Sequence, residues 1–205
     1  MRAITLHRHP DRMVIHVELK QNSLLKNVTD EQLSELEGHL QIVDAAKGDY
    51  LLTQGDRDME QYFVLQGMLK RVVTAPGSKK EMALRFSSER GMETSYAAWR
   101  LRTPAPYSIV ASTKCRVAKL NMPKWVEFLE LHPEFKAVFE FEVMALMGEI
   151  MAHTITLHLL DAPGRVHRFE RKHPDLFERI PKKELAAYLN LSAETLSRLK
   201  QRGKI

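Results

Sequence analysis

The sequence of 205 residues is long enough for one sizeable domain or two small ones, and its hydrophobic fraction of 44% is ordinary for a folded protein. It has no run approaching the roughly 20 apolar residues that cross a bilayer, and its start lacks the pattern of a secretory signal. We therefore expect a cytoplasmic protein with no membrane contact. A single cysteine, Cys115, excludes an internal disulfide framework and a four-cysteine zinc or iron–sulfur site within one chain.

The net charge of +5 is concentrated at the end of the chain. Residues 163–205 hold 11 Lys/Arg against 5 Asp/Glu, whereas the other 162 residues hold 20 basic and 21 acidic side chains. A basic segment on a near-neutral body is typical of a part that binds a polyanion, joined to a part that senses or assembles. Surface solubility alone would produce a smaller difference in charge between the two parts of the chain.

The first predicted elements are an arm and a helix. Residues 1–22 are expected to form a short strand or a partly ordered tail. No metal-ligand spacing joins the histidines of this arm, which are His7, His9 and His16. Residues 27–39, NVTDEQLSELEGH, begin as a helix should, because Thr29 is a suitable N-cap and Gln32 follows three residues later.

Between Gln41 and Met122 the hydrophobic period changes from that of a helix to that of strands. The predicted strands are QIVDA, DYLLTQ, QYFVLQ, MLKRVVT, KEMALRF, YSIVAS and CRVAKLN. The turns between them contain Gly48-Asp49, Gly55-Asp56, Gly67 and Pro76-Gly77. Several short strands at this spacing predict an antiparallel β-roll or jelly roll.

Cupin enzymes use a comparable roll, so a metalloenzyme is one alternative. They need a His-x-His pair and a nearby Glu to hold their metal. The corresponding stretch here is Thr53-Gln54-Gly55-Asp56, and one carboxylate without imidazoles does not make a transition-metal site. We therefore predict no metal and no catalytic residues, and the cupin-type enzyme is the least favoured alternative.

A proline-free segment from Phe135 to about Leu160 predicts a long helix, after a short one from Pro123 to Leu131. One apolar row has the 3–4 spacing of a coiled-coil seam: Phe141, Met144, Gly148, Met151, Ile155 and His158. A second row lies beside it: Phe139, Val143, Leu146, Ile150 and Leu157. One helix with two apolar rows can pack on its own β-roll and on a partner, so we expect a parallel homodimer; a helix buried in a monomer core is the alternative. Residues 161–164 are predicted to end the helix and form a hinge.

Residues 180–205 predict two short helices joined by a tight turn. The first begins at Pro181, which suits an opening position, and ends near Tyr188. Asn190 tolerates the left-handed conformation that a tight turn needs, and Ser192 is a good N-cap for the second helix. This pattern predicts a helix-turn-helix, in which the N-terminal half of the second helix enters the major groove of DNA.

The second helix carries the residue types that contact bases. Arg198 can make a bidentate contact to guanine, Glu194 can accept from a cytosine amino group, and Ser197 adapts to either. The candidate phosphate contacts are Lys182, Lys183, Thr195, Lys200, Arg202 and Lys204. The alternative is that these are solvated residues on an ordinary amphipathic helix, but the turn, the cap and the charge favour DNA binding.

At these residues the chain resembles the CRP/FNR family of transcription regulators. Residues 194–198, ETLSR, are similar to the recognition-helix signature of that family. The pattern KGDYLLTQGD…QYFVLQGMLK is similar to its sensor domain, also called the cyclic-nucleotide-binding fold. The run from Ala162 resembles a shorter subgroup that ends soon after the recognition helix, without the usual β-hairpin wing.

The resemblance implies an α+β protein made of four parts. These are an N-terminal arm (1–22), an antiparallel β-roll sensor domain (23–125), a dimerisation helix (126–162) and an all-α helix-turn-helix domain (163–205). The implied function is that of a homodimeric regulator that binds a palindromic DNA operator, with RNA polymerase as a candidate partner. The alternative is a small-molecule-binding module with little or no DNA binding.

The resemblance also locates a candidate effector pocket. Family members that bind cAMP use a Glu on the ribose and an Arg on the cyclic phosphate, but Ser95 and Tyr107 stand at those positions here. Without the Arg, a buried phosphate loses its bidentate contact, so we do not expect cyclic nucleotide to bind in the usual manner. No motif supports heme either. The candidate pocket residues are Ser95, Tyr96, Trp99, Tyr107 and Ser108, and the effector is left open.

Overall fold

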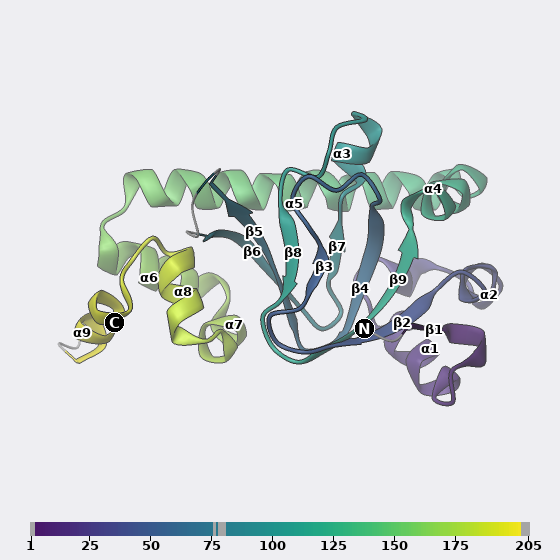
Figure 1. The fold of residues 1–205 in the computed structure, drawn as a ribbon, viewed down its shortest axis with the longest axis horizontal. Coiled ribbons are helices and arrows are strands. Elements are labelled where there is room, and N and C mark those ends of the chain that lie inside the picture. The colour runs from purple at the N-terminus through teal and green to yellow at the C-terminus, as the bar shows by residue number, and fades with distance from the viewer. Residues whose placement is uncertain (1–2, 76, 78–80, 202–205) are drawn as a thin grey trace.

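The computed structural model of the chain describes residues 3–75, 77 and 81–201. Figure 1 shows a β-roll with the long helix α5 (Pro133–Leu159) running along one side of it. Helices α1 and α2 lie near one end of α5, and helices α6 to α9 lie near the other end. Within the described ranges, every helix is too short or too polar to cross a bilayer.

The first residues form more structure than their sequence predicts. Strand β1 (Ala3–Thr5) pairs with β2, and η1 (Leu6–Arg8) leads into helix α1 (Arg12–Lys20), which the sequence analysis did not predict. The helix α1 forms because Ile15 and Leu19 are buried. After η2 (Leu25–Asn27) comes α2 (Asp30–Glu37), whose predicted start is confirmed by a complete capping box between Thr29 and Gln32.

Two antiparallel sheets form the β-roll. Their strand orders are β1-β2-β9-β4-β7 and β3-β8-β5-β6. All seven strands predicted between Gln41 and Met122 are confirmed, β1 agrees with the short strand that was one alternative for residues 1–22, and β7, with three residues, was missed. The strands are β2 (Gln41–Ala45), β3 (Tyr50–Leu52), β4 (Glu60–Gln66), β5 (Met68–Thr74), β6 (Glu81–Ser88), β7 (Met92–Thr94), β8 (Ser108–Ala111) and β9 (Cys115–Asn121).

The turn between β4 and β5 requires glycine. Gly67 has φ of +82°, and a Cβ at this position would lie 2.2 Å from the carbonyl oxygen of Lys114. The predicted turn at Gly67 is therefore confirmed, and its cause is both the backbone conformation and the close approach of the loop before β9.

Aromatic side chains fix helices α4 (Met122–Leu131) and α5 to the roll. Trp125 is fully buried, and its ring meets Phe63 of β4 at 5.5 Å and Phe139 of α5 at 5.3 Å between centroids. Such edge-to-face pairs stabilise a core beyond the area that they bury. The long helix is thus attached to the roll through its Phe139 row.

The non-helical segment between α5 and the next helix is shorter than predicted. Leu160 is extended, and α6 (Ala162–Lys172) begins two residues later, with the Asp161 side chain accepting from the Gly164 N–H at 3.0 Å. Pro163 and Gly164 therefore lie in the first turn of α6, and the prediction of a hinge over residues 161–164 is wrong. Proline suits this turn because its missing N–H would have no helical partner.

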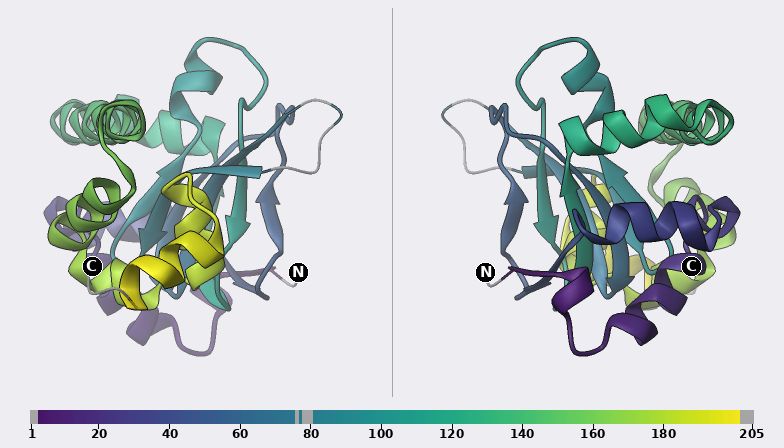
Figure 2. Two further views of the ribbon diagram at one scale, coloured as in Figure 1. Left: turned by 90° about the vertical axis from the view of Figure 1, so that its left-hand side faces the viewer. Right: turned by 90° about the vertical axis from the view of Figure 1, so that its right-hand side faces the viewer.

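The last helices pack against the four-stranded sheet. They are α7 (Pro174–Arg179), α8 (Lys182–Tyr188) and α9 (Ala193–Gln201). Phe86 of β6 meets Tyr188 edge-to-face at 5.4 Å, and Arg179 donates to both carboxylate oxygens of Glu89 at 2.8 Å. The terminal helices and the sheet share one hydrophobic cluster. In the left panel of Figure 2, the yellow terminal helices lie in front of the sheet.

Candidate functional site

Helices α8 and α9 are joined by a short turn that the local sequence dictates. Asn190 adopts φ of +53°, and the Leu191 N–H donates to the carbonyl oxygen of Ala186 at 2.8 Å. The Thr195 N–H donates to the Ser192 hydroxyl at 3.0 Å, so Ser192 caps α9 as predicted. Leu196 is buried against the other helices. The two helices therefore form one rigid unit.

The predicted base-contacting side chains lie together on α9. Glu194, Ser197 and Arg198 are all exposed, on the side of the helix away from the buried Leu196. A hydrogen bond from Ser192 lowers the pKa of the Glu194 carboxyl, so this group is ionised at neutral pH. The surface thus presents one acceptor, one hydroxyl and one forked donor, and the role of these groups on DNA stays a prediction.

The predicted phosphate contacts separate into two places. Lys182 and Lys200 line one open groove together with Ser197, so these three lie on the same surface. Lys183 instead lines a groove between α8 and the sheet, where Lys70 also lies. Thr195 is half-buried and its hydroxyl meets that of Ser192 at 3.0 Å. The two remaining candidates, Arg202 and Lys204, lie outside the described residues.

The candidate effector residues do not surround one open pocket. Ser95 is fully buried and its hydroxyl has no hydrogen-bond partner, while the Tyr96 hydroxyl donates to Glu140 at 2.7 Å. The Tyr107 hydroxyl donates to the carbonyl oxygen of Thr94 at 2.8 Å. The Ser108 hydroxyl accepts from the Gln54 N–H at 2.9 Å.

Trp99 lies apart from the other candidates. It lines an outward-facing hollow with three arginines, Arg57, Arg100 and Arg102. The structure therefore places Ser95, Tyr107 and Ser108 inside the roll, where the hydroxyls of Tyr107 and Ser108 bond to the protein itself, and places Trp99 at the edge of the roll.

The sequence analysis missed a buried ion cluster inside the roll. Arg71 donates to Glu93 at 2.6 and 3.0 Å, and Arg85 donates to the other carboxylate oxygen. The Arg71 guanidinium also lies 4.1 Å from the centre of the Tyr107 ring. Burial alone would raise the pKa of Glu93, but the two arginines lower it, so the carboxylate is charged.

One signal in the sequence points to this cluster. Strand residues alternate between two faces, so Arg71 shares its face with Leu69, which is fully buried. An arginine at an inward position of a strand requires a buried partner. The partner itself, Glu93 in the short strand β7, has no comparable signal in the sequence.

Comparison with known proteins finds one family model that matches the β-roll. Residues 42–132 match the family model described as "Cyclic nucleotide-binding domain". A comparison with curated protein sequences found no match.

Several solved structures have a similar fold. The c-di-GMP responsive global regulator CLP of Xanthomonas campestris has a TM-score of 0.69 at 15% identity, over 85% of this chain and 92% of that one. FixK2 of Bradyrhizobium japonicum has a TM-score of 0.67 at 14% identity, over 80% and 86% of the two chains. A CooA mutant of Carboxydothermus hydrogenoformans has a TM-score of 0.67 at 15% identity, over 89% and 84%.

These comparisons agree with the antiparallel roll and the helices that follow it. Residues 42–132 match the cyclic nucleotide-binding domain family, and the chain shares its fold with structural neighbours from the CRP/FNR regulator family, among them CLP, FixK2 and CooA.

Proposed function

We propose that this protein is a homodimeric, DNA-binding transcription regulator. In this proposal α8 and α9 form a helix-turn-helix, and α9 enters the major groove. The observation that carries the proposal is the arrangement of α9: Glu194, Ser197 and Arg198 are exposed together while Leu196 is buried. The basic charge of residues 163–205 supports it, because phosphate contacts supply much of the affinity for DNA.

The two apolar rows of α5 support the proposed dimer. Phe139 is fully buried against the roll, whereas the seam residues Phe141, Met144 and Met151 expose 64%, 64% and 63% of their surface. A row of large apolar side chains left in water at coiled-coil spacing fits a second copy of the same helix. Two recognition helices would then lie about one helical turn of DNA apart, roughly 34 Å, on a palindromic site.

The interior of the roll is proposed to lack the usual cyclic-nucleotide site. Arg71 lies inside the roll, where it donates to Glu93 and to the carbonyl oxygen of Thr94, the residue before Ser95, and lies over the ring of Tyr107. Since Ser95 and Tyr107 stand where the ribose and phosphate contacts would be, a cyclic phosphate would meet no arginine fork from these two positions.

The dimer is tested by placing a charge in the seam. Met151→Glu is expected to raise the dimer dissociation constant about a hundredfold, because two carboxylates would face each other in an apolar contact. Sedimentation velocity over a range of protein concentrations measures the change. Met13→Glu is the matched control, because Met13 is also largely exposed, at 73% against 63% for Met151, and lies on α1 outside the seam. A parent that sediments as a monomer at every concentration contradicts the proposed dimer.

The DNA contacts are tested with sites selected from a random pool of DNA. Arg198→Ala is expected to weaken binding by about 1–3 kcal/mol and to relax the preference at one base pair. Lys200→Ala, in contrast, should weaken binding to all sequences alike and reduce the slope of log affinity against log salt by about one. Fluorescence anisotropy at several salt concentrations measures both.

Arg57 provides the control for these measurements, because it is exposed beside Trp99 and Arg102, outside α8 and α9, and Arg57→Ala should bind as the parent does. If the parent selects no sequence, or binds DNA without salt dependence, the alternative of a small-molecule-binding module takes the place of the regulator.

A further inference from the structure

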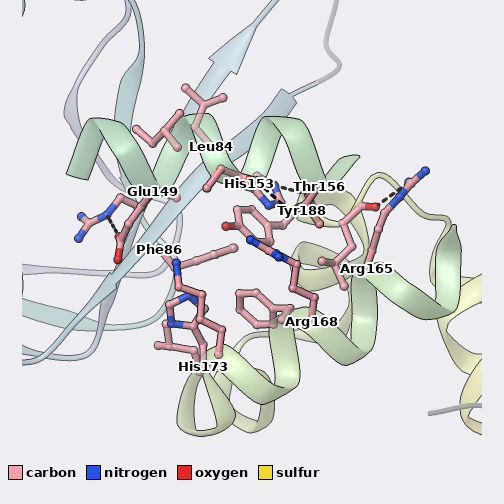
Figure 3. Close-up of a pocket in the computed structure, with 16 residues that line it drawn as sticks. Leu84, Phe86, Glu149, His153, Thr156, Arg165, Arg168, His173 and Tyr188 are labelled. Carbon is pink, nitrogen blue, oxygen red and sulfur yellow. Dashed lines mark hydrogen bonds and ion pairs between the residues drawn. The ribbon is translucent and has the colours of Figure 1, made fainter. Parts of the chain in front are cut away.

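A small cavity lies where the long helix, the β-roll and the terminal helices meet. It encloses about 60 Å³ and is lined by residues of β6, α5, α6 and α8 (Figure 3). Three buried aromatic rings form part of its wall: Phe86, Phe169 and Tyr188. None of the predicted effector residues lines this cavity, so it is distinct from the interior of the roll.

A stacked pair of rings gives the cavity a flat, rigid side. The His153 ring lies parallel to the Tyr188 ring, with centroids 3.8 Å apart and an interplanar angle of 1°. His153 Nε2 lies 3.0 Å from the carbonyl oxygen of Tyr188, and because a carbonyl only accepts, this nitrogen carries the proton. Burial lowers the pKa of His153 to about 4, so the ring is neutral at neutral pH.

The charged groups around the cavity are unbalanced. Four cationic side chains line it against one carboxylate, that of Glu149; the cations are Arg85, Arg165, Arg168 and Lys172. Arg165 is already satisfied, because it donates to the carbonyl oxygens of Leu160, Leu189 and Asn190 at the ends of two helices. Such an excess of positive charge beside an apolar wall favours an anion.

Two of these cationic side chains are free to bind an anion. Within the described ranges, Arg168 and Lys172 form no ion pair, and in Figure 3 the Arg168 side chain extends toward Tyr188 and His153 while Arg165 points away. Arg85 is partly engaged by Glu93, but its Nε–H is buried without a hydrogen-bond partner and lies 3.7 Å from Glu149. An unpaired buried donor is energetically costly unless something accepts from it.

We propose that this cavity binds a small planar oxyanion, such as a short carboxylate, nitrate or bicarbonate, with Arg168 as its principal contact. On the scale of this volume, about 60 Å³, one water needs roughly 10–15 Å³, so the cavity has room for a few waters or for one small anion. A planar anion matches both the flat wall and the two parallel N–H bonds of a guanidinium fork. The proposal goes beyond DNA binding and does not depend on it.

An occupant of this cavity touches both the roll and the terminal helices. Phe86 belongs to strand β6, whereas Arg168 and Tyr188 belong to α6 and α8. A ligand held between these elements favours the arrangement in which they are close, which is how a small molecule shifts a two-state equilibrium. The occupied cavity therefore fixes the position of α9 relative to the roll.

The test is a titration of the full chain in the absence of DNA. Sodium nitrate and sodium acetate each replace sodium chloride at constant ionic strength, and the arginine Nε–H and histidine ring signals are followed by NMR. We expect saturable shifts at Arg168 and His153. Arg168→Gln is expected to weaken binding about tenfold or more, because it removes a charge-assisted bidentate contact.

The control is Arg171→Gln, which removes the same charge from the same helix at a side chain that does not line the cavity. It should change the dissociation constant by less than about twofold, since an exposed charge outside the site is screened by salt. Arg168→Lys keeps the charge without the fork and should weaken binding by an intermediate factor. Arg168 is exposed, so these variants should fold as the parent does.

Three results would overturn the proposal. One is an NMR shift that rises linearly with the concentration of either anion and never saturates, because this shows that no binding site exists. Another is equal weakening by Arg171→Gln and Arg168→Gln, which marks diffuse charge attraction. The third is unaltered affinity in Arg168→Lys, which contradicts recognition by the guanidinium fork. Because no DNA is present, a failure here is independent of any failure in the proposed DNA binding.

Discussion

Glu93→Ala is expected to lower the free energy of unfolding by about 3–5 kcal/mol, the range for removing one partner of a buried ion pair. The substitution leaves the Arg71 guanidinium inside the roll, where it retains only the carbonyl oxygen of Thr94 and the face of the Tyr107 ring. Neither neutralises a charge that is almost fully withdrawn from water. Urea denaturation followed by circular dichroism measures the loss.

The matched control is Glu127→Ala, which breaks an exposed pair with Lys124 on α4. Exposed ion pairs contribute little to stability because water and salt screen them. The free energy of unfolding of this variant should therefore be close to that of the parent. A second variant, Arg71→Met combined with Glu93→Leu, removes the two fully buried charges and leaves Arg85, which is partly exposed and keeps Glu149 at 3.7 Å. It should recover most of the loss, because a buried ion pair can often be replaced by apolar side chains of similar size.

The opposite outcome for Glu93→Ala is equally informative. If the free energy of unfolding of this variant lies within about 1 kcal/mol of the parent value, water must reach Arg71 in the folded protein. The interior of the roll would then be open enough for a ligand, and the proposal that its own side chains fill the usual nucleotide position would be wrong.

Phe139→Ala is expected to lower the free energy of unfolding by about 3–5 kcal/mol, since truncating a buried Phe leaves a cavity that the core fills only in part. The Phe139 ring is fully buried between Tyr96, at 5.0 Å, and Trp125, at 5.3 Å. The loss should also loosen α5 from the roll, because Phe139 belongs to the row that holds the two together. Urea denaturation at low protein concentration measures it.

Phe141→Ala is the natural comparison, because it makes the same change two residues along the same helix. Phe141 is 64% exposed, so the stability of a single chain should change by no more than about 0.5 kcal/mol. Its effect should appear instead as a higher dimer dissociation constant and a stronger dependence of unfolding on protein concentration. Similar losses in the two variants at low concentration would contradict the assignment of the two rows to different partners.

Much of the local structure follows from the sequence. The seven predicted strands form where β-branched and aromatic residues recur between turn residues. The capping box at Thr29, the cap at Ser192 and the turn at Asn190 involve groups within three to five residues of each other. Such contacts depend on backbone geometry alone, so sequence spacing is enough to predict them.

The sequence also gives the composition of the candidate DNA-reading surface. Leu196 is buried and the polar residues around it on α9 are exposed, as in an amphipathic helix. Amphipathicity alone therefore predicts which side of α9 faces the solvent. The helix α1 was missed because its five apolar residues do not lie on one face. Met13, Val14 and Val17 are exposed, which leaves only Ile15 and Leu19 to pack it. Its stability comes from tertiary contacts rather than from a clear periodic pattern.

What the sequence by itself determined is the order of strands and helices, their caps and turns, and the sides on which their apolar residues lie. Only the tertiary structure decided which row of α5 packs on the roll, that Glu93 meets Arg71 across 22 positions, and that β6, α5, α6 and α8 line a cationic cavity. The reason is physical: periodicity records how residues on one element face, whereas pairing between distant elements depends on shape and desolvation, which no local pattern encodes.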